Sequence, residues 1–126
     1  MTEGELKERT KDFALRVIKF ASALPHNSEG RAIAGQLIRS ATSVGANYRA
    51  ACRGRSSNEF IAKLGIVEEE ADESAYWMEL IIQGKLLPAD RVIDLLQEAS
   101  ELTAMMVSSR VTASRPALGI HDKPQS

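Results

Sequence analysis

Cysteine, histidine and aromatic residues are scarce in this chain of 126 residues. It holds one cysteine, Cys52, and two histidines, and aromatic residues make up only 5% of it. A lone cysteine excludes an internal disulfide and is typical of proteins in a reducing cytoplasm. Alanine, leucine, isoleucine, glutamate and arginine dominate instead, and this mixture favours helices over strands.

Long apolar runs are also absent. Runs such as Leu80–Ile82 and Leu86–Leu87 fall far short of the roughly 20 residues that span a bilayer. The segment Met1–Glu8 is acidic and polar, which is unlike a secretory signal. We therefore expect a cytoplasmic protein that makes no contact with a membrane.

The shortage of histidine argues against a metal centre. A di-iron or di-manganese bundle needs a Glu-x-x-His pair on each of two helices, but His26 falls in a predicted loop and His121 near the C-terminus. Glu69, Glu70 and Glu73 alone could hold a hard cation, but the predicted opposing helix offers an arginine in place of further carboxylates. We expect neither a metal nor a cofactor.

Nucleophilic catalysis lacks its usual partners. Cys52 lies at the C-terminus of a predicted helix, where the helix dipole disfavours a thiolate, and no histidine is near it in sequence. Ser40 and Ser43 have no recognisable general base, and no glycine-rich phosphate loop follows a strand. The sequence therefore predicts no catalytic residue and no enzymatic activity.

Apolar residues do recur at helical spacing in four segments, at about residues 5–24, 29–53, 57–83 and 89–111. The connections between them are short, which predicts an all-α, antiparallel, up-and-down four-helix bundle. The bundle is expected to span residues 1–113. Residues 114–126 contain Pro116, Gly119 and Pro124 without any period, and they are predicted to form a flexible tail.

Residues typical of helix ends separate the four segments. Ser28 is predicted to cap the second helix, Gly54 to end it in a left-handed turn, and Ser56 with Glu59 to form a capping box for the third. Pro88 is predicted to lie near the first position of the last helix. The aromatic residues Tyr48, Tyr76 and Trp77 lie at helical spacing and are predicted to be core residues.

The second helix carries an unusual number of polar residues on its predicted inner face. If the following turn centres near residue 55, antiparallel pairing places Arg39 level with two glutamates that share one face of the third helix. An arginine held by two carboxylates is a charge-assisted interaction that fixes helix register. We call this predicted set the polar seam: Gln36, Arg39, Ser40, Ser43, Asn47, Glu70 and Glu73.

The formal net charge of −1 hides a strong asymmetry. Residues 9–63 carry ten basic and three acidic residues, a charge of +7, whereas residues 64–104 carry ten acidic and two basic residues, a charge of −8. Either the helices pair their complementary charges, or a basic face is kept for an anionic partner. For the second interpretation, the candidate RNA-binding residues are Arg49, Arg53 and Arg55.

Two stretches of the sequence resemble a known family. QLIRSATSVGANYRAACRGRS (residues 36–56) and EFIAKLGIVEEEADESAYWMELI (residues 59–81) are similar to the core signature of the bacterial four-helix bundle proteins, also described as 23S ribosomal RNA intervening-sequence proteins. Many members have an acidic residue shortly after the asparagine, where this chain has Arg49. The resemblance implies a left-handed bundle that assembles into a ring-like homo-oligomer, a pentamer.

Two functions follow from these observations. The first is a non-catalytic homo-oligomeric scaffold whose partners are copies of itself or another protein. The alternative is a protein that associates with ribosomal RNA or the ribosome through a basic patch. The resemblance links the family to ribosomal RNA through the location of some of its genes, which is a genetic context and not a binding activity.

Overall fold

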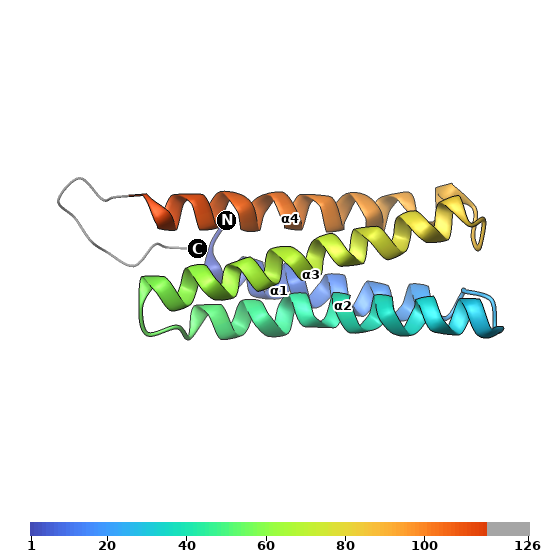
Figure 1. Ribbon diagram of the computed structural model, residues 1–126, viewed down its shortest axis with the longest axis horizontal. Coiled ribbons are helices and arrows are strands. Elements are labelled where there is room, and N and C mark those ends of the chain that lie inside the picture. The colour runs from blue at the N-terminus through green and yellow to red at the C-terminus, as the bar shows by residue number, and fades with distance from the viewer. Residues whose placement is uncertain (116–126) are drawn as a thin grey trace.

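The computed structural model describes residues 1–115 and contains four long helices and one short 3-10 helix, with no strand in that range. The helices run alternately up and down along one common axis (Figure 1). The predicted all-α four-helix bundle is therefore confirmed. The elements are α1 (Glu3–Ala21), α2 (Ser28–Cys52), α3 (Ser57–Gln83), η1 (Ala89–Arg91) and α4 (Ile93–Ser114).

Each helix directs one apolar stripe inward, and the stripes meet in a single core. α2 packs between α1 and α3, and α4 packs mainly on α3, while α1 and α4 form the least extensive of the four contacts between neighbouring helices. The side chains that fill the centre include Phe13, Tyr48, Phe60 and Met78, all buried. No helix in the described range is both long and apolar enough to cross a membrane.

The first helix begins earlier and ends earlier than predicted. Thr2 accepts a hydrogen bond from the backbone N–H of Glu5, and the Glu5 carboxylate accepts one from the N–H of Thr2, so the helix begins with a capping box that was not predicted. At the other end, the N–H groups of Ala23 and Leu24 bond three residues back. This tighter turn ends the α-helix at Ala21 but keeps Leu24 in the core.

The prediction that Ser28 caps α2 is wrong, because Asn27 does so. The Asn27 side-chain oxygen accepts a hydrogen bond of 2.9 Å from the N–H of Gly30. Gly30 is buried against the preceding turn, and a Cβ atom there would lie 1.9 Å from the carbonyl oxygen of Pro25. The close return of the chain between α1 and α2 therefore requires glycine at position 30.

The predicted left-handed turn at Gly54 is also wrong. Gly54 has no positive φ, and its surroundings are tight, because a Cβ atom would lie 3.1 Å from the carbonyl oxygen of Ala51 and 3.2 Å from the nitrogen of Phe60. The left-handed residue is Lys85, with φ 57°, in the turn after α3. A non-glycine residue occupies this conformation at an energetic cost.

The remaining predicted helix starts are correct in part. Ser56 caps α3 by accepting from the N–H of Glu59, but the Glu59 carboxylate bonds to the N–H of Arg55 and not to that of Ser56. Pro88 precedes η1, and α4 begins only at Ile93, four residues later than predicted. The predicted tail boundary falls at the end of α4, and residues 116–126 lie outside the described range.

The glycine requirement at position 30 gives a direct test. Gly30→Ala places a methyl group against the backbone of Pro25, so we expect the free energy of unfolding to fall by about 1–3 kcal/mol. Gly65→Ala in α3 is the matched control, because nothing lies within 4 Å of its Cβ position. It should gain about 0.5–1 kcal/mol from helix propensity. Urea unfolding that ranks the two variants in the opposite order would contradict this account.

Candidate functional site

The polar seam joins α2 to α3 through one arginine. The Arg39 guanidinium lies 3.3 Å from both carboxylate oxygens of Glu70 and also donates to the carboxylate of Glu73. The side-chain oxygen of Gln36, one turn earlier, lies 3.4 Å from Nε of Arg39. The predicted contact between Arg39 and the two glutamates is therefore confirmed.

The position of this cluster differs from the prediction of an inner face. The Arg39 side chain is 47% exposed and Gln36 is exposed, whereas Glu70 is 19% exposed. Removing a guanidinium and two carboxylates from water would cost more than their pairing returns, so the cluster lies at the edge of the α2–α3 contact.

Ser40 is the one seam residue of α2 that is fully buried. Its hydroxyl lies 2.9 Å from the hydroxyl of Ser74 on α3, and Ser74 also donates to the backbone carbonyl of Glu70. Ser74 lies at helical spacing from the core residues Phe60, Leu64 and Val67, and this spacing predicts its burial but not its bonding partner.

Ser43 and Asn47 do not reach α3. The Ser43 hydroxyl donates to the carbonyl of Arg39, and the Asn47 amide donates to the carbonyl of Ser43, both within α2. Both residues are half-buried. They therefore satisfy polar groups along one helix, and the cross-helix seam consists of Arg39, Ser40 and their partners.

Glu73 extends the cluster to two aromatic residues. Its carboxylate accepts a hydrogen bond of 2.9 Å from the indole N–H of Trp77, and Trp77 meets Tyr76 edge-on with ring centroids 5.3 Å apart. The Trp77 N–H and then Arg39 hold the pKa of the Glu73 carboxyl below its ordinary value. The prediction that Tyr76 is a core residue is wrong, because it is 52% exposed.

Part of the charge asymmetry is accounted for by ion pairs between helices. Arg9 of α1 makes two hydrogen bonds of 2.7 Å to Glu98 of α4 and one of 2.8 Å to Glu101, and this pairing raises the arginine's pKa. On the α3–α4 side, Arg110 lies 2.9 Å from Glu68. Together with Arg39, these contacts join three neighbouring helix pairs by complementary charge.

The three arginines of the predicted basic patch do not form ion pairs between helices of the described range. Arg49, Arg53 and Arg55 are exposed, and their side chains form no ion pair with any residue in the range 1–115. Arg49 lies in the last turn of α2, Arg53 caps its C-terminal end, and Arg55 follows in the turn to α3. The structure therefore leaves a cationic group of side chains at this end of the bundle.

Cys52 and His26 are the cysteine and the histidine within the described range. Burial raises the pKa of the Cys52 thiol, which disfavours its nucleophilic form. His26 is exposed in the turn after α1, and within residues 1–115 no group of three or more histidine, cysteine or acidic side chains could hold a metal ion. His121 lies outside the described range.

Comparison with known proteins gives one family. The model of the 23S rRNA-intervening sequence protein family matches residues 3–108. A solved structure from Bacteroides thetaiotaomicron, described as a protein with unknown function from the S23 ribosomal protein family, is 29% identical and has a TM-score of 0.80. The similarity covers 88% of this chain and 99% of that one. No curated protein matches.

The lowered pKa of Glu73 predicts a pH-dependent contribution to stability. The ionised carboxylate stabilises the fold at neutral pH, and this stabilisation is lost as pH falls through the lowered pKa of the folded state. Arg39→Gln should therefore lower the urea midpoint at pH 7, and its difference from the unmodified protein should shrink towards pH 3. Arg16→Gln, an exposed arginine without an ion pair in the described range, is the control. An equal loss at both pH values would show that Arg39 acts only through packing.

Proposed function

The chain belongs to the 23S rRNA-intervening sequence protein family, and on this basis we propose that it is a non-catalytic bundle that assembles with copies of itself into an interaction scaffold. The observation that carries the proposal is a set of large apolar side chains that remain exposed to water and do not belong to the buried core. Leu15 and Ile18 on α1 are 60% and 46% exposed, and Tyr76 on α3 is 52% exposed. Large apolar side chains exposed on the surface of a folded monomer favour contact with another protein.

The chemistry of the polar residues supports a role without catalysis. In the polar seam, Arg39 is engaged by two carboxylates and the buried hydroxyl of Ser40 by that of Ser74. Groups that hold one another are poorly placed to activate a substrate. The raised pKa of Cys52 points the same way, and an unbridged thiol suits a cytoplasmic location.

The proposed assembly is a ring, with a pentamer as the expected size. A ring of five copies needs contacts in which one face of a copy meets a different face of the next. The bundle has such unlike faces, because α3 carries exposed carboxylates, whereas α1 and α2 carry exposed cations with no ion pair in residues 1–115: Arg16, Lys19, Arg31 and Arg49. Complementary faces of this kind favour head-to-tail contact over a two-fold dimer.

The assembly is tested by mass. Light scattering coupled to size exclusion at micromolar concentration should give one discrete species larger than a dimer, with five copies as the expected number. The species should keep its mass on moderate dilution, since a closed ring breaks two contacts to lose one copy. A monomer under these conditions would refute the scaffold proposal.

A second candidate, association with ribosomal RNA, rests on one specific observation. Arg9, Arg39 and Arg110 are committed to ion pairs between helices, whereas the patch of Arg49, Arg53 and Arg55 has no such partner within residues 1–115. Guanidinium groups that face water at one end of a bundle can neutralise phosphates.

Replacing Arg49, Arg53 and Arg55 with alanine tests this candidate. If the patch binds RNA, affinity for structured ribosomal RNA should fall, and the slope of log K against log salt should become shallower by about 2–3, one for each lost phosphate contact. The matched control replaces three exposed cations elsewhere, Arg16, Lys19 and Arg31. Equal losses in both triple variants would indicate general charge attraction, and undetectable binding at low salt would exclude RNA as the ligand.

A further inference from the structure

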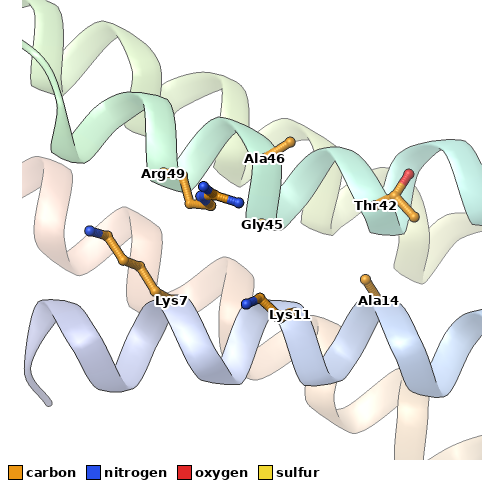
Figure 2. A pocket seen from close by; sticks show the side chains of 7 residues that line it. All are labelled: Lys7, Lys11, Ala14, Thr42, Gly45, Ala46 and Arg49. Atoms are coloured by element: carbon orange, nitrogen blue, oxygen red, sulfur yellow. The ribbon is translucent and has the colours of Figure 1, made fainter.

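A hollow of about 210 Å³ opens between α1 and α2 near the N-terminal end of α1 (Figure 2). Its floor consists of small side chains, and no acidic residue lines it. Gly45 allows the two helices to approach here, because a Cβ atom would lie 3.3 Å from the hydroxyl of Thr10. We call it the α1–α2 groove, and its lining residues are Lys7, Lys11, Ala14, Thr42, Gly45, Ala46 and Arg49.

The rim of the groove is cationic. Figure 2 shows Lys7 extending from α1 and Arg49 from α2 into the space between the helices. The ammonium groups of Lys7 and Lys11 lie 3.4 and 3.9 Å from glutamates of their own helix, in exposed pairs. Such pairs contribute little and exchange readily for another carboxylate.

The walls indicate what kind of occupant fits. A cavity of about 150 Å³ accommodates benzene, so a hollow of this size is large enough for one aromatic ring. The groove is lined by helix-interior residues whose backbone N–H groups are already used, so a small free anion would find only mobile side chains. An aromatic side chain flanked by carboxylates therefore fits the groove: the ring suits the floor of small side chains, and the carboxylates suit the cationic rim.

The chain itself carries such a feature on α3. Glu69, Asp72, Tyr76 and Glu79 are spaced by three, four and three residues, so they share one face of the helix, and all four are exposed. None of the three carboxylates forms an ion pair with another described residue. We call these four residues the α3 stripe.

The polar seam holds the aromatic member of this stripe in place. Tyr76 contacts the edge of Trp77, whose N–H is bonded to Glu73, and Glu73 is bonded to Arg39 of α2. An exposed ring that is already supported loses less conformational entropy when it binds. The stripe and the groove share no residue, so one copy can use both surfaces at once.

We infer that the α3 stripe of one copy docks into the α1–α2 groove of another. Tyr76 enters the hollow over Ala14 and Ala46, and the stripe carboxylates pair with the rim cations, while Arg49 is placed to meet the ring face. The contact joins two different surfaces, so it repeats from copy to copy and closes into a ring when the rotation allows. This inference rests on the proposed self-assembly and specifies the surfaces that make it.

The test uses one variant for each surface. Ala46→Glu adds bulk and a negative charge to the groove floor at an exposed position, and Tyr76→Ser removes the ring from the stripe. Each variant alone should lose the higher mass and run as a monomer. Mixed in equal amounts they should form a species of two copies, because an intact stripe remains on one variant and an intact groove on the other. Ala32→Glu, an exposed alanine elsewhere on α2, should retain the full assembly.

The possible outcomes separate the two proposals. A monomeric unmodified protein refutes self-assembly itself. An unmodified oligomer whose mass survives both Ala46→Glu and Tyr76→Ser, with helical circular dichroism retained, refutes the docking inference alone. Loss of assembly in Ala32→Glu, or no two-copy species in the mixture, also refutes it.

Lys11→Glu, on the exposed surface of α1, gives a second groove variant should Ala46→Glu unfold. It should likewise reduce the unmodified mass to that of a monomer. If it leaves the mass unchanged but abolishes binding to ribosomal RNA, the groove is a nucleic-acid site and the docking inference fails.

Discussion

The structure depends on keeping charge at the edges of helix contacts while apolar stripes meet inside. Each helix has one apolar face, and the core forms only if the helices align at a single register. Arg39 between Glu70 and Glu73, and Arg9 against Glu98, lie beside that core and join neighbouring helices with directional bonds. Pairs at such edges select the correct neighbour and register, because a shifted helix would leave them unmatched.

This constraint also sorts the cations into two groups. Arginines that face an acidic neighbouring helix, such as Arg9 and Arg110, are paired within the chain. Those at the groove rim and around the α2–α3 turn, Arg49 and Arg53 among them, face water. The strong asymmetry along the sequence therefore has two origins: pairing between helices, and a group of cations without an ion pair in residues 1–115.

The polar seam connects fold stability to the molecular surface. Ser40 and Ser74 bond inside the core, Arg39 and Glu73 bond at its edge, and Trp77 extends the chain of contacts to the exposed ring of Tyr76. A set of residues that resembles an active-site strip when read along one helix thus forms a support for one outer face. Its polar groups bond to one another, and they support the outer face of α3 that carries Tyr76, where we propose that another copy binds.

The sequence by itself determined the helical class, the short turns and the pairing of Arg39 with two glutamates, because these follow from periodicity and local spacing. It misplaced features that depend on three-dimensional approach: Asn27 as the cap of α2, the close contact that requires Gly30, and the Ser40–Ser74 bond. The exposure of Tyr76 could not be predicted for the same reason. Helical spacing shows on which side of a helix a residue lies, but not how far the neighbouring helices cover that side. The groove between α1 and α2 exists only in the tertiary structure, because its rim comes from residues some 40 positions apart that packing brings together.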